Sequence, residues 1–345
     1  MIKRIGFCCK WINDASEIAG IKPDAESKRY NTKTTTVSWL NRQTKQVAEQ
    51  KLWELMTHNI QSTYNLVEKV GNLNENLRMV RISSDILPVY THNDYSYFWN
   101  QTFVREYAEK NFASIGDLAR DRNIKLSFHP GQFCVLASDN ENVIEQSIKE
   151  FEYHVDMARW MGYGKYFHDH GFKINVHISG KGGPEKFLQT YKKLSPEAKN
   201  LITVENEENS WGLDDCLTIC HSVPIVLDIH HHWCKEGTYI GSQDPRIARV
   251  VDSWRGIRPT LHYSVSREDV LVDHCTETLP DHNFLIESKG KRQKLRAHSD
   301  FYWNNAVNNW ALSFLTEFDI QCEAKAKNLA SFKLYDMAKQ LNILI

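Results

Sequence analysis

The stretch Leu201-Ile202-Thr203-Val204-Glu205 is a run of leucine and β-branched residues that ends on a carboxylate. Such a run of a few residues is typical of a buried strand. Four more runs end in the same way on a histidine or an aspartate: Leu126-Ser127-Phe128-His129, Ile174-Asn175-Val176-His177, Ile225-Val226-Leu227-Asp228 and Thr260-Leu261-His262. In a (β/α)8 barrel the carboxyl ends of the strands meet on one face, where catalytic groups collect. The recurrence therefore predicts a polynuclear site for divalent metals on one face of a barrel.

The rest of the chain alternates strand-like with helix-like segments, the arrangement that forms parallel sheets. Strands are expected at residues 4–8, 77–82, 123–129, 172–178, 201–205, 224–229, 258–263 and 319–323. Helices are expected at residues 44–69, 98–122, 142–161, 184–193, 213–221 and 245–254, and from residue 326 to the C-terminus. This alternation predicts an α/β fold in which residues 1–345 form a single TIM barrel, without repeats or linkers.

Two connections are longer than a simple crossover requires. One is residues 264–312, between the seventh and eighth expected strands, and the other is an irregular loop over residues 10–36. Long connections after the strands of a barrel usually belong to its active face. Two enlarged loops on one rim imply a groove for a substrate larger than a metabolite.

The composition is that of an ordinary soluble globular protein, with 41% hydrophobic and 25% charged residues in 345. Because the chain has no long apolar run and begins with a strand-like segment, we expect no membrane association. The eight cysteines are scattered without a CxxC motif, which favours reduced thiols. A cytoplasmic protein is therefore expected, nucleoid-associated in a bacterium or nuclear in a eukaryote.

The formal net charge of −1 argues against nucleic-acid binding through overall charge, but it leaves room for a local patch. The run Lys289-Gly290-Lys291-Arg292-Gln293-Lys294-Leu295-Arg296 holds five basic residues in eight positions. Such a run is most often a solvated loop, and it suits phosphate contacts if it lines the active face.

The expected ligands also indicate the chemistry. Buried carboxylates are costly unless a cation compensates them, and a mixed imidazole and carboxylate set suits Mn, Zn or Fe. Two or three such ions close together perform displacement at phosphorus well. Metal-dependent sugar isomerases use similar ligands, so the ligands alone do not name the substrate. In extended geometry His230 and His232 would face one way and His231 the other, so at most part of this triplet reaches the metals.

Several motifs together resemble those of the UV damage endonucleases, which share a metal-dependent barrel with endonuclease IV. The motifs are Arg81-Ile82-Ser83-Ser84-Asp85-Ile86-Leu87-Pro88, Ser127-Phe128-His129-Pro130-Gly131-Gln132-Phe133, Val204-Glu205-Asn206-Glu207, Val226-Leu227-Asp228-Ile229-His230-His231, His262-Tyr263-Ser264, Ala297-His298-Ser299-Asp300 and Glu323-Ala324-Lys325. The resemblance implies a cluster of up to three divalent ions, most often Mn2+, with Zn2+ or Mg2+ as alternatives. The ligands that it implies are Asp85, His129, His177, Glu205, Asp228, His231, His262, His298 and Glu323.

The same resemblance implies cleavage of duplex DNA immediately 5′ of a UV photoproduct, leaving a 3′-hydroxyl and a 5′-phosphate. Cyclobutane dimers and 6-4 photoproducts are the expected lesions, with abasic sites as an open third substrate. Among the ligands, Glu205, as a bridging carboxylate, and His231 and Glu323 are expected to be catalytic.

Five further residues are expected to contact the DNA. Gln132 and Phe133 match a probe that the family inserts at the lesion, although Phe133 could instead be a core aromatic. The remaining three expected contacts are Phe7, Trp11 and Lys181.

The chain departs from the family at three places. Phe7 stands where the family usually has Tyr, and Trp11 stands where it has Asn, unless the loop shifts so that Asn13 serves. Thr260 stands where some members carry a modified lysine, which excludes a modified-lysine ligand at that position. A second Glu-x-Lys motif, Glu287-Ser288-Lys289, competes with Glu323-Ala324-Lys325 for the eighth strand. We favour Glu323 because it follows the His298 motif and precedes a helix.

The sequence therefore predicts a barrel endonuclease for damaged double-stranded DNA, without an obligate protein partner. The alternatives are an endonuclease IV-like enzyme for abasic sites, a sugar isomerase or epimerase, and a catalytically inactive damage-binding protein. Long loops and the Gln132-Phe133 pair favour DNA over sugar, and the complete ligand set disfavours an inactive protein.

Overall fold

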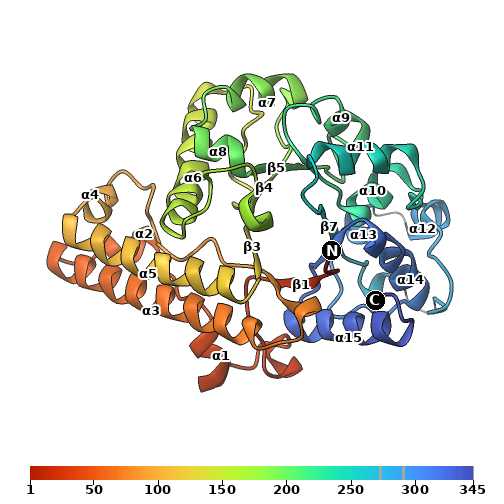
Figure 1. Ribbon diagram of the computed structural model, residues 1–345, viewed down its shortest axis with the longest axis horizontal. Helices are drawn as coiled ribbons and strands as arrows, with labels where there is room; N and C mark the ends of the chain where they lie inside the picture. Colours follow the sequence, from red (N-terminus) through yellow and green to blue (C-terminus); the bar gives the residue numbers. More distant parts are fainter. Residues whose placement is uncertain (272–273, 290–291, 345) are drawn as a thin grey trace.

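The computed structural model, which describes residues 1–271, 274–289 and 292–344, contains one sheet of eight parallel strands (Figure 1). In chain order they are β1 Ile5–Cys8, β2 Met79–Arg81, β3 Lys125–Phe128, β4 Lys173–His177, β5 Ile202–Glu205, β6 Ile225–Val226, β7 Thr260–Tyr263 and β8 Asp319–Cys322. Their order in the sheet is β6-β5-β4-β3-β2-β1-β8-β7. A parallel bridge between Asp228 and His262 joins the β6 and β7 ends, so the sheet is a nearly closed barrel. All eight expected strands, and the expected α/β barrel, are confirmed.

The strands of the barrel are buried along nearly all of their length. All four residues of β5 are buried, as are those of β1 and β3. Gly6 in β1 is required by the close approach of β2, since a Cβ at this position would lie 2.4 Å from the carbonyl oxygen of Met79. The strand ends are therefore held in fixed positions relative to one another.

Helices surround the barrel (Figure 1). The principal ones are α3 Lys45–Gly71, α5 Thr102–Asp121, α6 Glu141–Trp160, α7 Gly183–Tyr191, α8 Pro196–Leu201, α9 Leu213–Leu217, α10 Ile229–Glu236, α11 Pro245–Ser253 and α15 Lys327–Gln340. Side chains cap many of them. Thr44 accepts from the amide of Val47 at the start of α3, and Ser195 accepts from the amide of Ala198 at the start of α8. The helix α8 was not expected from the sequence. Among the described helices, none combines the length and the apolar character that a membrane span requires.

The connection after β1 is more ordered than expected. It contains a 3-10 helix at Ala15–Glu17 and the helices α1 Ala25–Tyr30 and α2 Val37–Leu40. Asp24 caps α1 by accepting from the amide of Ser27 at 2.7 Å. The prediction of an irregular loop over residues 10–36 is therefore wrong at residues 15–17 and 25–30, and a capping aspartate precedes each of these two helices.

The long connection between β7 and β8 folds against the barrel. It contains the helices α12 His282–Lys289, α13 Arg292–Leu295 and α14 Asn305–Leu312. Leu285 and Leu295 from this connection pack with Trp233 and Cys234 of α10 in a second apolar cluster. Of the basic run that the sequence analysis singled out, Gly290 and Lys291 lie outside the described residues. Glu287 lies in α12, so Glu323, which directly follows β8, is the barrel carboxylate as expected.

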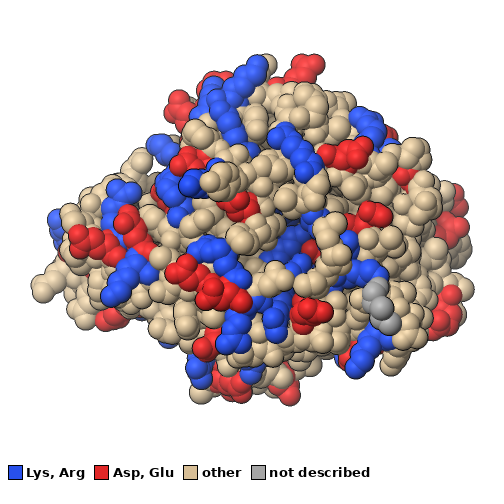
Figure 2. Space-filling model, viewed as in Figure 1, with Lys and Arg blue, Asp and Glu red and all other residues tan. Residues whose placement is uncertain are grey.

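Charge is unevenly distributed over the surface. Figure 2 shows lysine and arginine side chains gathered near the middle of one face, with acidic side chains interspersed. Local positive surface therefore exists on a chain whose formal net charge is −1.

Candidate metal centre

The barrel brings the expected ligands to one face. His177 and Glu205 are the last residues of β4 and β5, and they are direct partners in the register of these strands. Asp228 and His262 are paired in the bridge between β6 and β7. Because the strands are parallel, their carboxyl ends point the same way. His129, which follows β3, joins the same face.

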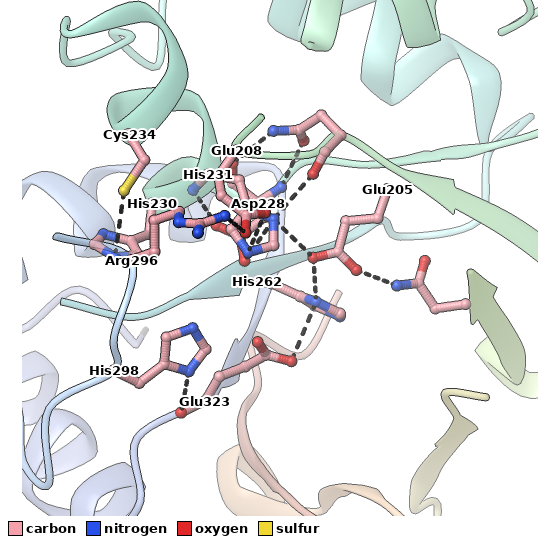
Figure 3. A network of polar contacts seen from close by, with 12 residues as sticks. Glu205, Glu208, Asp228, His230, His231, Cys234, His262, Arg296, His298 and Glu323 are labelled. Carbon is pink, nitrogen blue, oxygen red and sulfur yellow. Dashed lines mark hydrogen bonds and ion pairs between the residues drawn. The ribbon is translucent and has the colours of Figure 1, made fainter. Parts of the chain in front are cut away.

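Glu205 is the centre of this arrangement (Figure 3). Its Oε2 lies 3.3 Å from His129 Nε2, and its Oε1 lies 3.1 Å from His262 Nδ1. His231 Nδ1 lies 3.6 Å from Oε1. From below, the side-chain amide of Asn175 donates to Oε2, and Thr203 donates to Asn175 at 2.8 Å. The carboxylate of Glu205 is thereby fixed among three imidazoles. His262 also contacts Glu323, whose Oε1 lies 3.4 Å from His262 Nδ1.

The side chains form two groups that could each hold a divalent ion. His129, His177 and Glu205 make one group, and Glu205, Asp228 and His262 make the other, with the ligand atoms of each group within 4.8 Å of one another. Glu205 belongs to both groups, which is the arrangement that a bridging carboxylate requires.

Unsatisfied polar atoms support this fit. His177 Nδ1, Glu205 Oε1, Asp228 Oδ2 and His262 Nδ1 are buried and make no well-formed hydrogen bond, although Glu205 Oε1 and His262 Nδ1 lie 3.1 Å apart as an ion pair. Buried polar atoms are normally paired, and a cation would pair all four. The mixed nitrogen and oxygen donors suit a transition-metal ion such as Mn2+ or Zn2+.

Backbone carbonyls orient three of the histidines as metal ligands are usually oriented. His129 Nδ1 donates to the carbonyl of Pro130 at 3.0 Å, and His231 Nδ1 donates to that of Asn206 at 3.0 Å. His298 Nδ1 donates to the carbonyl of Glu323 at 2.9 Å. In each ring this leaves Nε2 for an ion, although His298 belongs to neither of the two groups found among the described residues.

The His230-His231-His232 triplet is helical, so the expectation of an extended geometry is wrong. Asp228 caps α10 by accepting from the amide of His231 at 2.7 Å, and the helix then points successive side chains about 100° apart. Only His231 faces the centre. His230 Nε2 donates to the carbonyl of Leu295 at 3.1 Å. Both ring nitrogens of His232 are buried without a hydrogen-bond partner.

Asp85 is an expected ligand that belongs to neither of the two groups among the described residues. It is exposed in a turn, four residues beyond the end of β2. Burial raises the pKa of Glu150, and the charge of Asp85 adds to this shift. The last residue of β2, Arg81, occupies the strand end and donates to Glu323. Arg81 was quoted in a motif without a function, although its position at a strand end matched that of the other functional residues.

Burial and neighbouring charges shift the pKa values of the side chains at the centre. Burial raises the pKa of Asp228 well above its usual range. Burial would raise the pKa of Glu205 too, but His262 and His177 outweigh this effect and lower it well below its usual range. Burial would lower the pKa of His231, but Asp228, Glu205 and Glu208 raise it to about 9. At neutral pH, protons therefore occupy part of a site that cations would fill.

Two further residues at the centre were missed. Glu208, three residues beyond β5, places Oε2 3.7 Å from His231 Nε2. Lys173, at the start of β4, places its amine 3.4 Å from His262 Nε2, and burial lowers its pKa to about 7 although Glu205 opposes the shift. The inward alternation Lys173, Asn175, His177 along β4 could have identified the lysine.

The expected DNA contacts fall into two classes. Phe133 is 84% exposed, so it is not a core aromatic, and Gln132 and Lys181 are exposed as well. Phe7 and Trp11 are 1% and 6% exposed and meet edge to face at 5.9 Å. The expectation that these two rings contact DNA is therefore wrong for this structure.

The comparisons with known proteins identify the family. The family described as UV-endonuclease UvdE matches residues 4–344. The UV-damage endonuclease of Schizosaccharomyces pombe is 29% identical over 293 residues, which are 81% of this chain and 43% of that protein. The UV DNA damage endonuclease of Bacillus cereus (strain B4264) is 26% identical over 319 residues, 88% of each chain. This chain thus spans less than half the length of the first relative and most of the second.

Solved structures agree with the fold. The crystal structure of SacUVDE covers 99% of both chains with a TM-score of 0.71 and 23% identity. Endonuclease IV from Thermus thermophilus gives a TM-score of 0.50 with 13% identity, over 80% of this chain and 93% of that one. From the family match along nearly its whole length, the chain belongs to the UV-endonuclease UvdE family.

Proposed function

We propose that this chain is a metal-dependent DNA repair endonuclease that nicks UV-damaged duplex DNA immediately 5′ of the photoproduct. The observation that carries the proposal is the pair of three-residue groups that share the buried Glu205. Family membership supports a DNA-cleaving hydrolase, because the relatives are named for endonuclease action at UV damage. The exposed Gln132-Phe133 pair on the same face supports a duplex substrate.

The residues suited to hold the ions are the two groups around Glu205, with His231, His298 and Glu323 at their edge. Divalent ions, most often Mn2+ in such a site, would lower the pKa of the attacking water and stabilise the leaving oxygen. The protein prepares this chemistry by fixing its ligands in advance. Asn175 holds Glu205, and Arg81 holds Glu323, so little reorganisation is needed on binding.

Recognition of damage is assigned to the loop after β3. His129 lies at the centre, and Gln132 and Phe133 project from the surface three and four residues later. An aromatic wedge can replace the stacking that a damaged duplex has lost, and such a duplex is easier to open.

The loop after β4 packs against this β3 loop and carries Lys181. The amide of Gly182 donates to the carbonyl of Ala137 at 2.9 Å, and a Cβ on Gly180 would lie 2.4 Å from the same carbonyl oxygen. Lys181 therefore lies in a loop that contacts the loop of the proposed probe, and a phosphate contact there would add affinity for any duplex.

The experiment that tests the function is nick mapping. The protein is incubated with Mn2+ and end-labelled duplexes that each contain one defined lesion: a cyclobutane dimer, a 6-4 photoproduct or an abasic site. We expect a single nick directly 5′ of each photoproduct and an intact undamaged duplex. Cleavage of the abasic duplex alone would establish an endonuclease IV-like specificity instead, and no cleavage of any duplex would refute the proposal.

A further inference from the structure

Arg296 lies in a part of the β7–β8 connection that is held by hydrogen bonds on both sides. The carbonyl of Leu295 accepts from Ser266 Oγ at 2.5 Å. Two residues after Arg296, His298 forms an antiparallel bridge with Ser266 and donates to the carbonyl of Glu323 at 2.9 Å. Because the backbone is held at Leu295 and at His298, the backbone of Arg296 has a defined position at the edge of the centre.

The guanidinium of Arg296 reaches the centre through one carboxylate (Figure 3). Arg296 Nη1 donates to Glu208 Oε1 at 3.0 Å, and Glu208 Oε2 lies 3.7 Å from His231 Nε2. Within the described ranges, Glu208 is the only side chain or carbonyl that bonds this guanidinium. The Arg296 side chain is 25% exposed, so its other N–H donors face solvent rather than protein.

Arg81 shows how an arginine in the same centre behaves when its function is internal. Arg81 pairs with Glu323, and the two side chains are only 15% and 11% exposed. Its Nε is buried without a partner. The Arg296–Glu208 pair is more open and has donors to spare, so the second arginine is available to a ligand that arrives from solvent.

We propose that Arg296 binds a backbone phosphate of the DNA substrate at the edge of the metal centre and that Glu208 holds its guanidinium in position. This inference rests on the proposed function, which supplies the phosphate. A guanidinium presents parallel donors that match phosphate oxygens. The centre itself is rich in carboxylates, namely Glu205, Glu208, Asp228 and Glu323, which repel a phosphate. A fixed cation beside them offsets that repulsion where the scissile strand must pass.

The competing explanation is that Arg296 only neutralises Glu208. A double-mutant comparison separates the two. Arg296→Gln, Glu208→Gln and the double variant are compared with wild type for binding to a duplex at several salt concentrations, with Ca2+ in place of Mn2+ to limit cleavage. Arg246→Gln is the matched control, because Arg246 also pairs with a carboxylate, Asp244, and is 29% exposed.

We expect Arg296→Gln to weaken duplex binding roughly tenfold, as for one charge-assisted hydrogen bond. The slope of log K against log salt should become shallower by about 0.9, the value for one phosphate contact. The lower affinity and the shallower salt slope should both persist in the double variant, and Arg246→Gln should show neither change. Arg296→Lys, which keeps the charge but not the fork, should retain the slope and lose part of the affinity.

A double variant that regains wild-type affinity and slope would overturn the proposal, because Arg296 would then serve only to neutralise Glu208. An unchanged slope in Arg296→Gln would overturn it as well. Melting temperatures establish that each variant is folded, and Arg296→Met, which also removes the charge, replaces Arg296→Gln if the latter is not. Since the slope is measured by binding to undamaged duplex, it tests the phosphate contact even if nick mapping refutes lesion-directed cleavage.

Discussion

The centre around Glu205 and the loop that carries Phe133 lie on the same face of the barrel, and they hold their functional side chains in opposite ways. Glu205 is fully buried, and Asn175 and His129 hold its carboxylate from two sides. Phe133 is 84% exposed in the loop after β3. Chemistry at phosphorus needs ligands that are placed before the substrate arrives, whereas a probe must be free to enter the duplex. The two regions should therefore fail separately when they are mutated.

The largest expected effect is at the centre. Glu205→Gln keeps the size of the side chain but removes the charge that two ions are expected to share. Incision should fall by several orders of magnitude, and bound Mn2+, measured by elemental analysis, should decrease. Glu207→Gln, two residues along and bonded only to Ser210 and Trp211 among the described residues, is the control and should incise normally. Near-normal turnover and metal content in Glu205→Gln would contradict the bridging assignment.

The second effect is a pH dependence of metal binding. His231 must be neutral to bind an ion, but Asp228, Glu205 and Glu208 outweigh burial and raise its pKa to about 9. Ions and protons therefore compete, so affinity for Mn2+ should rise by about tenfold per pH unit for each proton displaced, from pH 7 to about 9. Calorimetric titrations in buffers of different ionisation enthalpy would detect the released protons.

The metal-free protein should respond to pH in the opposite direction. A pKa raised from 6.5 to about 9 on folding stabilises the protein below pH 6.5, and this contribution is lost as the pH rises through about 9. His231→Asn should flatten both profiles. Mn2+ affinity that stays constant between neutral pH and pH 9 would show that His231 is not protonated in the metal-free centre.

The third effect is confined to the probe. Base stacking on an aromatic side chain contributes about 1–3 kcal/mol, so Phe133→Ala should weaken binding to damaged duplex by about 5- to 150-fold. Metal content and melting temperature should barely change, because the ring is exposed. Tyr166→Ala is the control, since Tyr166 is 63% exposed and lies between α6 and β4, at the amino end of the strands. A large fall in melting temperature with unaltered lesion preference would remove Phe133 from recognition.

The buried centre was the more predictable of the two regions. The same local pattern, an apolar run that ends on a possible metal ligand, occurs at five strands. It allowed one group to be predicted before any contact was known: His129, His177, Glu205, Asp228 and His262. What the sequence could not supply were the residues defined by contacts across the barrel.

Arg81 and Glu208 acquire their importance from Glu323, His231 and Arg296, which are distant in the sequence. Asp85 shows the complementary limit. It stands in a motif that resembles the family, and only the structure shows that it lies in an exposed turn and outside the two groups around Glu205.

Rules for local structure could have corrected one wrong prediction, the extended geometry of residues 230–232, but not another, the DNA contacts of Phe7 and Trp11. An aspartate followed by a helix-compatible run is a typical N-cap, so the helical state of His230, His231 and His232 could have been inferred from Asp228. The burial of Phe7 and Trp11 could not, because it depends on Tyr30 and Phe332, which pack over Trp11 from α1 and α15.

The smallest expected effect separates the probe from general affinity for DNA. Lys181 is exposed in the loop after β4, which contacts the β3 loop. If Lys181 contacts only phosphate, its contribution to binding does not depend on whether the duplex carries a lesion. Lys181→Ala should therefore weaken binding by a few fold, equally for damaged and undamaged duplex, and make the salt slope shallower by about 0.9. Lys165→Ala, which removes an exposed lysine between α6 and β4, should leave both quantities unchanged. Fluorescence anisotropy over a range of salt concentrations measures both quantities. If Lys181→Ala instead weakens binding only to the damaged duplex, then this lysine reads the lesion itself, and recognition extends from the β3 loop to the β4 loop.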